Sequence, residues 1–299
     1  MVDSPPPVSA IGVLGAGTMG HGIAQVAAAA GYRVMLRDVN ESAVTRGLES
    51  IKRNLEKGIQ RGKVTEAERD QIIAQIQTTT SIEDLRDADL IVEAAPESLD
   101  LKQTLLRETE AVIRRDCIFA TNTSSLSIDE IAGVSSRPEQ VVGMHFFNPV
   151  HLMRLVEIVV GARTSESTVA AVRAVAQRMK KEPIIVRDVP GFASSRLGVT
   201  LGLEAMRMVE QGVASARDID TAMELGYNHP MGPLRLTDLV GLDVRLSIAE
   251  YLHGKLGSET FRPPEILRRM VREGKLGKKS GEGFYKWGDG AEPLTAASL

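Results

Sequence analysis

The sequence has few of the residues that mark several specialised classes of protein. It contains a single cysteine, Cys117, which cannot form an intramolecular disulfide or a cysteine-rich zinc site, and we expect no bound metal. Because Cys117 lies in the apolar run 117–120, we expect it to be a small buried residue. Long apolar runs are also missing: no stretch approaches the roughly 18 consecutive apolar residues of a membrane-spanning helix.

The sequence also lacks an excess of charge of either sign. Its 36 Lys and Arg residues nearly balance 39 Asp and Glu residues, giving a formal net charge of -3. The chain as a whole therefore has no electrostatic attraction for nucleic acid or for an anionic membrane, and any anion-binding site must be local. Residues 1–7 hold an acid and three prolines where a signal peptide would hold basic residues and an apolar core. We expect a disordered leader and a cytoplasmic protein.

The order of predicted elements indicates an α/β protein. In the first half, short β-branched runs alternate with helical patterns, which is typical of βαβ units and a mostly parallel sheet. The charged segment 41–75 interrupts this alternation with a helical period, a break at 62–65 and a capping-box start at Thr65, so we expect an inserted helical pair that projects from the sheet. The predicted strands are 11–14, 34–37, 90–94, 117–121, 141–145, 155–160 and 183–186, with a further helix at 167–180.

The last third of the chain has helical patterns only. The length of 299 residues predicts two domains, and Val189-Pro190-Gly191 marks a boundary because it joins a rigid proline to a permissive glycine. We therefore expect a first domain at 1–187 and an all-α second domain at 188–299. The predicted helices of the second domain are 196–211, 218–225, 234–252 and 265–273.

A glycine-rich turn follows the first predicted strand. In the pattern G-x-G-x-x-G, the first glycine permits a tight turn, the second lets the backbone approach a pyrophosphate, and the third allows close packing of helix on strand. The turn opens a helix whose free N–H groups can bind phosphates. The residues of this motif that we expect to bind the cofactor are Gly15, Gly17, Thr18, Met19 and Gly20.

An acidic residue, Asp38, closes the next predicted strand at the spacing expected of the group that binds the adenosine ribose. Its carboxylate would repel a 2′-phosphate, which favours NAD over NADP, although the neighbouring Arg37 argues the other way. Together with the glycine turn, Asp38 predicts a Rossmann-type domain that binds NAD. The alternative is a glycine turn without a ligand and an exposed acid at a strand end.

A histidine and a glutamate lie in consecutive predicted strands. Glu157 is a carboxylate inside an apolar strand, where it needs a partner to offset its desolvation. His145, which ends the preceding strand, can supply that partner. Such a pair would fix the imidazole ring and stabilise its protonated form, so that the other ring nitrogen could take a proton from a substrate hydroxyl. The alternative is a histidine whose hydrogen bonds are merely structural.

Further motifs follow in a fixed order. They are 92–97 (VEAAPE), 121–125 (TNTSS), 144–149 (MHFFNP), 190–192 (PGF), 230–233 (PMGP) and 281–285 (GEGFY). With the glycine turn, they resemble those of the short-chain (S)-3-hydroxyacyl-CoA dehydrogenases, especially the 3-hydroxybutyryl-CoA dehydrogenase branch, over residues 11–287. The resemblance implies an NAD-dependent enzyme that oxidises an (S)-3-hydroxyacyl-CoA to the 3-ketoacyl-CoA, or runs the reverse reaction. It also implies a substrate with a short acyl chain, such as 3-hydroxybutyryl-CoA.

The resemblance also implies roles for individual residues. His145 matches the general base of the oxidation and general acid of the reduction, Glu157 matches its orienting partner, and Ser124 matches the residue that hydrogen-bonds the reacting oxygen. One position departs from the family: the asparagine that helps to position the substrate is Ser195 here, a shorter side chain without an amide. The resemblance also implies four further cofactor contacts, at Glu97, Lys102, Asn148 and Lys279.

Basic residues recur at every fourth position of the inserted segment. Arg53, Lys57 and Arg61 are expected on one helical face. The resemblance favours a role for them in holding the phosphates of coenzyme A, whereas a solvated charged face is the alternative.

Two other functions remain open. One is a dehydrogenase of a free 3-hydroxy acid or sugar acid on the same scaffold. The other is a cofactor-binding structural or regulatory protein that has lost turnover. Ser195 suggests this alternative, and the presence of Ser124, His145 and Glu157 argues against it. The helix from Arg196 is rich in Leu, Met and small residues, so this pattern and the resemblance together predict a homodimer through the second domain.

Overall fold

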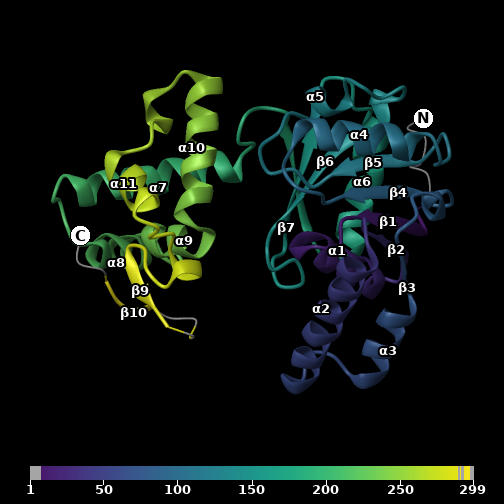
Figure 1. Ribbon diagram of the computed structural model, residues 1–299, viewed down its shortest axis with the longest axis horizontal. Helices are drawn as coiled ribbons and strands as arrows, with labels where there is room; N and C mark the ends of the chain where they lie inside the picture. The colour runs from purple at the N-terminus through teal and green to yellow at the C-terminus, as the bar shows by residue number, and fades with distance from the viewer. Residues whose placement is uncertain (1–7, 289, 291–292, 297–299) are drawn as a thin grey trace. The chain divides into compact units, whose positions relative to one another are not determined.

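The computed structural model describes residues 8–288, 290 and 293–296, and the predicted leader at 1–7 lies outside this part of the chain. The contacts within the chain divide it into two compact units, Met1–Phe192 and Ala193–Leu299. This division falls just beyond the predicted boundary at 187/188. Figure 1 shows the helices and strands of each unit. Among the described residues, none of the helices combines the length and the apolar character needed to cross a membrane.

The first unit is built on a sheet whose eight strands, counted in the described part of the chain, follow the order β3-β2-β1-β4-β5-β6-β7-β8. β6 and β7 pair antiparallel, and the other neighbouring strands pair parallel, which confirms the predicted α/β class. The strands are β1 (Ala10–Leu14), β2 (Arg33–Arg37), β3 (Ile76–Thr79), β4 (Leu90–Glu93), β5 (Ile118–Thr121), β6 (Val141–Phe146), β7 (Leu155–Val160) and β8 (Glu182–Arg187). β3 was not predicted, because this edge strand is mostly polar and carries no apolar run.

Helices cover both faces of this sheet, because successive residues of its central strands are apolar. Leu90 and Val92 of β4 pack in one core with residues of α1, α2 and α6, whereas Ile91 packs in the opposite core with residues of α4 and α5. This burial on both faces is typical of parallel sheets. The helices are α1 (Thr18–Ala29), α2 (Glu41–Gln60), α3 (Glu66–Ala74), α4 (Leu99–Glu110), α5 (Ile128–Ala132) and α6 (Glu166–Arg178), with short 3₁₀ turns at Glu83–Leu85 and Pro138–Gln140.

α2 and α3 form the inserted helical pair expected from the sequence. The capping box that begins α3 is present: the backbone N–H of Thr65 donates to Glu68 Oε2 at 2.7 Å, and the N–H of Glu68 donates to Thr65 Oγ1 at 3.2 Å. In Figure 1 the two helices extend downward from the strands, so the pair projects from the sheet. Ile51 and Leu55 anchor α2 in the core of the unit.

The second unit is mainly helical, as predicted. Its core joins side chains of the five helices to Phe284, Tyr285 and Trp287. Its elements are α7 (Ser194–Glu210), α8 (Ala216–Gly226), α9 (Pro233–Val240), α10 (Leu242–Leu256), α11 (Glu265–Arg272), β9 (Tyr285–Trp287) and β10 (Pro293–Ala296), with 3₁₀ turns at Glu259–Phe261 and Lys278–Ser280.

Two details of this unit differ from the prediction. The segment 234–252 was expected to be one helix, but α9 ends before Gly241, whose φ of 105° lies in the left-handed region and cannot continue a helix. The unit also contains two strands where none was expected, since β9 and β10 pair antiparallel. Both strands are too short to show a clear alternation of apolar and polar residues.

Candidate active site

The predicted glycine turn connects β1 to α1. A Cβ atom at Gly20 would lie 1.7 Å from the carbonyl oxygen of Gly15, so only glycine allows the helix to pack this closely. Gly15 has a φ of +98°, which a glycine adopts without strain. At Gly17, by contrast, no described atom would lie within 4 Å of an added Cβ. The backbone is therefore open to a ligand at Gly17, as the second glycine of a dinucleotide site requires.

Asp38 lies directly beside this turn. Its Oδ2 accepts the backbone N–H of Ala16 at 2.7 Å, and its Oδ1 accepts that of Val39 at the same distance. Asp38 and Gly17 line one hollow together with Arg46 of α2. The neighbouring Arg37 donates from Nε to the carbonyl oxygen of Thr80 at 3.2 Å. The carboxylate therefore sits where an adenosine ribose would approach the turn, and the residues present fit a dinucleotide.

The structure brings His145 and Glu157 together. They are directly opposite in the antiparallel register of β6 and β7, and His145 Nδ1 lies 2.7 Å from Glu157 Oε2. The Glu157 side chain is fully buried and that of His145 is 9% exposed. Phe147 packs against the imidazole, with the two ring centroids 4.5 Å apart. A buried carboxylate held against one ring nitrogen fixes the orientation of the ring.

Glu97 holds the loop that carries Ser124. Its Oε1 accepts the backbone N–H groups of Ser124 and Ser125 at 2.9 and 3.1 Å, and the Thr123 hydroxyl at 2.6 Å. The Ser124 hydroxyl lies 3.3 Å from the same oxygen. Burial alone would raise the pKa of Glu97, but the nearby Lys102 charge and these hydrogen bonds outweigh it and hold the pKa below its ordinary value. Glu97 is thus a charged anchor for the Ser124 loop.

A buried ion pair lies beneath this loop. Lys102, only 1% exposed, places its Nζ 2.8 Å from Oε1 of the fully buried Glu93 and 3.5 Å from Oε2 of Glu97. The Thr121 hydroxyl donates to the other Glu93 oxygen at 2.6 Å. The sequence reasoning missed Glu93, although it carries the same signal as Glu157, a carboxylate in an otherwise apolar strand. Lys102 was expected to contact the cofactor; its described contacts are to protein carboxylates and to the carbonyl oxygen of Ala95.

Asn122 is another residue that the sequence reasoning missed. Its Oδ1 accepts the backbone N–H of Phe146 at 2.8 Å and so joins the ends of β5 and β6. Asn148, which was expected to contact the cofactor, follows β6 with an exposed side chain. The expected catalytic and cofactor-binding residues of the first unit therefore gather where β1, β2, β4, β5 and β6 end, which is the usual ligand-binding edge of an open parallel sheet.

Two expected site residues belong to the second unit. Ser195 lies in the first turn of α7. Lys279 pairs with Asp243, its Nζ lying 2.5 and 2.6 Å from the two carboxylate oxygens. Burial would raise the pKa of Asp243, but the hydrogen bond and charge of Lys279 outweigh it and lower that pKa.

The basic residues of α2 do not all share one site. Lys57 and Arg61 line a hollow together with the ends of α1 and α6. Arg53 instead lines a different hollow with Lys52 and Arg69. The structure therefore brings two of the three expected coenzyme A residues together and separates the third.

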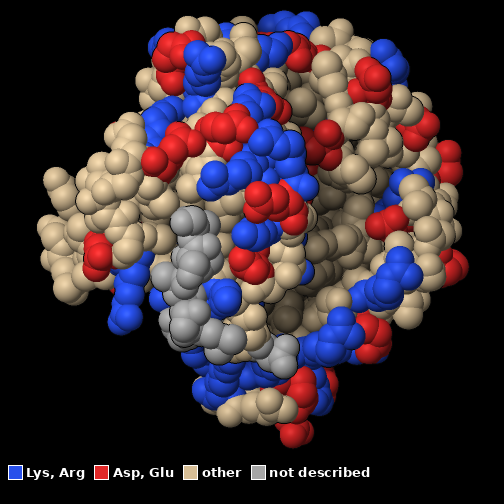
Figure 2. All heavy atoms as spheres, turned by 60° about the vertical axis from the view of Figure 1, so that its left-hand side comes forward, with Lys and Arg blue, Asp and Glu red and all other residues tan. Residues whose placement is uncertain are grey.

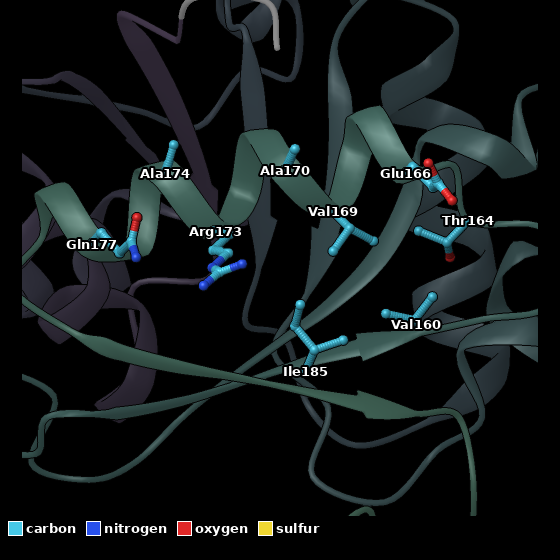
Figure 3. A pocket seen from close by; sticks show the side chains of 9 residues that line it. All are labelled: Val160, Thr164, Glu166, Val169, Ala170, Arg173, Ala174, Gln177 and Ile185. Atoms are coloured by element: carbon cyan, nitrogen blue, oxygen red, sulfur yellow. The ribbon is translucent and has the colours of Figure 1, made fainter. Parts of the chain in front are cut away.

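A further hollow lies between α6 and the edge strand β8 and contains none of the expected site residues. Figure 3 shows Val169 and Arg173 of α6 pointing toward the strand that carries Ile185. Its lining includes one basic and one acidic side chain, Arg173 and Glu166. It therefore offers no concentration of charge of one sign.

The parallel sheet, the glycine turn before α1 and the acid after β2 define a dinucleotide-binding α/β protein. Comparison with known proteins is more specific. Residues 10–189 match the family model described as 3-hydroxyacyl-CoA dehydrogenase, NAD binding domain, and residues 191–287 match 3-hydroxyacyl-CoA dehydrogenase, C-terminal domain.

Individual relatives agree with these two matches. The chain is 45% identical to a probable 3-hydroxybutyryl-CoA dehydrogenase of Deinococcus radiodurans, covering 92% of this chain and 99% of that protein. It is 42% identical to a 3-hydroxybutyryl-CoA dehydrogenase of Clostridioides difficile, over 93% and 99% of the two chains. A crystal structure of (S)-3-hydroxybutyryl-CoA dehydrogenase from Ralstonia eutropha matches with a TM-score of 0.92 and 41% identity, over 95% of this chain and all of that one. The chain belongs to the 3-hydroxyacyl-CoA dehydrogenase family of NAD-dependent oxidoreductases, which confirms the resemblance found in its motifs.

Proposed function

We propose that the protein oxidises (S)-3-hydroxyacyl-CoA thioesters to 3-ketoacyl-CoA with NAD, and catalyses the reverse reduction, with short acyl chains such as 3-hydroxybutyryl. The observation that carries this proposal is the 2.7 Å pairing of His145 with the buried Glu157, at the same sheet edge as the glycine turn, in a chain of this family. NAD, when bound, supplies the acceptor for the hydride that leaves C3 of the substrate.

In this mechanism, Glu157 accepts a hydrogen bond from Nδ1–H of His145, which assigns the free lone pair of the ring to Nε2. Nε2 takes the proton of the substrate hydroxyl during oxidation, and the adjacent carboxylate stabilises the imidazolium that results. In the reduction, the same nitrogen returns the proton to the 3-keto oxygen. The Ser124 hydroxyl hydrogen-bonds this oxygen, and Glu97 fixes the loop from which it does so.

The glycine turn and Asp38 would hold the cofactor. The open backbone at Gly17 can approach the pyrophosphate, and the Asp38 carboxylate can accept hydrogen bonds from the ribose hydroxyls while repelling the 2′-phosphate of NADP. Glu97, Asn148 and Lys279 remain proposed cofactor contacts. For Lys102, we propose that its contribution is to hold Glu97, since its charge is buried between two carboxylates.

The acyl-CoA substrate would place its phosphates at Lys57 and Arg61, which line the same hollow. Ser195 would occupy the position from which the family's asparagine helps to position the substrate. The first unit would thus bind the cofactor. A cytoplasmic location stays a prediction.

We also propose that the protein is a homodimer through the second unit. Exposed apolar side chains on α7, α9 and α10 support this proposal, because isolated helical units rarely leave so many such residues in solvent. These residues are Leu197, Leu236, Leu239, Val240 and Val244.

The test is the loss of NADH absorbance with acetoacetyl-CoA, run beside free acetoacetate and beside NADPH. Rapid NADH oxidation with the thioester alone is the expected result. Turnover of free acetoacetate at a similar rate would instead support the dehydrogenase of a free acid. NADH binding without turnover of 3-ketoacyl-CoA of any chain length would support a protein that has lost catalysis.

A further inference from the structure

A hollow of about 380 Å³ lies in the first unit, where α1, α2 and α6 end and the turn between β6 and β7 leads into β7. It shares no lining residue with the hollow at the glycine turn. Both hollows nevertheless lie along α1 and α2. Thr18 and Arg46 line the hollow at the glycine turn, whereas Gln25 and Asn54 line the other one. Asn54 donates to Gln25 at 3.3 Å between the two helices. A second ligand could therefore lie beside the dinucleotide, farther along the same pair of helices.

The charged side chains that line this hollow are all basic. Within the described part of the chain, its lining includes no Asp or Glu. This is a local property: on the face shown in Figure 2, acidic and basic side chains are interspersed, and the net charge of the whole chain is -3. The basic lining residues are Lys57, Arg61, Lys63, Arg154, Arg178, Lys180 and Lys181, with His151 beside them.

Several of these charges have no carboxylate beside them. Lys181 is 7% exposed and donates to the backbone carbonyl oxygens of Val150 and Met153, the latter at 2.8 Å. Arg178 donates to the carbonyl oxygen of Ala30 at 2.9 Å. Carbonyl groups satisfy the donors but leave the positive charge in place. Arg154 is different, because it pairs with Glu182.

Lys180 gives independent support for a ligand. It follows the C-cap of α6 with a φ of 58°, in the left-handed region that glycine adopts most easily and that strains a lysine. Its side chain is exposed at the hollow. A lysine at a position that favours glycine indicates a use for the side chain, since backbone strain of this kind gathers at functional sites.

His151 lies in the same positive surroundings. Burial lowers the pKa of its imidazole, and the charges of Lys181 and Lys57 together with the nearby His21 lower it further. An anion in the hollow would reverse this effect and favour the protonated, doubly donating imidazole.

We propose that Lys180 and His151 form a second wall of a phosphate site, which holds the nucleotide end of the CoA thioester together with Lys57 of α2 and Arg61 at the C-terminal end of that helix. Lys181 provides a buried positive charge in the same lining. This inference rests on the proposed function, because it takes a CoA thioester as the substrate. The family resemblance implies a role only for the α2 residues, and it assigns none to His151, Lys180 or Lys181.

The experiment compares steady-state constants for acetoacetyl-CoA and for acetoacetyl-pantetheine, which lacks the nucleotide and its phosphates. Lys180→Gly should raise the KM for acetoacetyl-CoA about tenfold, because it removes a charge-assisted contact, and should leave kcat and the KM for NADH unchanged. The same variant should raise the Tm, since glycine relieves the strain at this position. Its KM for acetoacetyl-pantetheine should equal that of the wild type. His151→Gln should show the same selective loss.

Arg154→Gln is the matched control, because Arg154 lines the same hollow but already pairs with Glu182. Its KM for acetoacetyl-CoA should stay within about twofold of the wild type. An equal loss in this control would overturn the assignment to Lys180 and His151. The assignment would also be overturned if both test variants kept the wild-type KM for acetoacetyl-CoA while Lys57→Gln or Arg61→Gln raised it. That result would leave the proposed function intact. Failure of the wild type to reduce acetoacetyl-CoA would instead overturn the proposed function, and the second wall with it.

Discussion

His145 and Glu157 face each other across an antiparallel strand pair, with Nδ1 of the imidazole 2.7 Å from Oε2 of the carboxylate. The sheet is mostly parallel, and among its described strands only β6 and β7 are neighbours that run in opposite directions. The His145–Glu157 pair lies between these two strands. The short connection between β6 and β7 returns the chain so that the two residues become cross-strand neighbours. The backbone therefore fixes the positions of both groups before any substrate arrives, which is the preorganisation that general acid–base catalysis requires.

Glu157→Gln should keep the fold of the hairpin but lose the negative charge beside the ring. We expect kcat to fall by about 10²- to 10⁴-fold, because the tautomer and the imidazolium are no longer stabilised, while the Kd for NADH stays near that of the wild type. Stopped-flow or steady-state rates with NADH fluorescence titration would measure both quantities. A kcat within a few-fold of the wild type would remove Glu157 from the mechanism.

Glu97→Gln should disturb the Ser124 loop, because one carboxylate oxygen of Glu97 accepts hydrogen bonds from three consecutive residues. We expect kcat/KM for acetoacetyl-CoA to fall by about 10- to 100-fold. Glu110→Gln is a matched control, since Glu110 accepts from the backbone N–H and hydroxyl of Ser136 in a similar way, outside the proposed site. Equal losses of activity in the two variants would show that Glu97 has only a structural role.

Two glycines of the turn should respond differently to the same substitution. Gly20→Ala would force a Cβ against the Gly15 carbonyl oxygen, so we expect a loss of stability on the order of 3 kcal/mol and a lower Tm. Gly17→Ala meets open space and should keep a Tm near that of the wild type, yet bind NADH more weakly because the methyl group obstructs the pyrophosphate. Thermal unfolding and NADH titration of both variants would check this. Normal NADH affinity in a folded Gly17→Ala variant would contradict the proposed position of the cofactor.

Asp238 should make the second unit less stable as the pH rises. Burial raises its pKa to about 6, although its carboxylate accepts N–H groups of Phe284, Tyr285 and Trp287. Since this pKa exceeds the ordinary value of 3.8, the folded state binds the proton more tightly than the unfolded state does. The stabilisation that results from this proton is fully present below about pH 4 and is lost as the pH rises through 6. Between pH 5 and pH 7, this group should lower the free energy of unfolding by about 1.4 kcal/mol.

Urea unfolding followed by tryptophan fluorescence suits this measurement, because Trp287 is the one tryptophan of the sequence and donates directly to Asp238. Asp238→Asn should be less stable than the wild type, since an amide accepts fewer hydrogen bonds, and should lose this part of the pH dependence. The same slope between pH 5 and pH 7 in both proteins would contradict the raised pKa of Asp238.

The sequence predicted the features that depend on local patterns. The glycine turn, the inserted helical pair and the burial of Cys117, which is 1% exposed with a pKa raised to about 12 by that burial, all follow from residues close together in the chain. It did not predict the edge strand β3, because polar side chains there face solvent and only backbone pairing with β2 defines the strand. Long-range pairing of this kind leaves little trace in an apolar pattern.

Within the site, helix geometry and long-range packing also decide positions that spacing in the sequence does not identify. Arg53 and Arg61 were expected on one face, but each step of four residues turns an α-helix by about 40° beyond a full turn, so two steps carry the first and last side chains apart. The packing of α4 against β4 places Lys102 beside the buried Glu93, a partner that no spacing in the sequence identifies. Its expected contact with the cofactor stays a prediction.

The most direct test of the account is the rate of NAD reduction with (S)-3-hydroxybutyryl-CoA by the wild type and by His145→Ala, with saturation by NAD verified for each. The account predicts rapid reduction by the wild type and a kcat lower by about 10³-fold or more in the variant, with the Kd for NADH unchanged. A variant that binds NADH normally and turns over within about tenfold of the wild-type rate would contradict the assignment of proton transfer to His145.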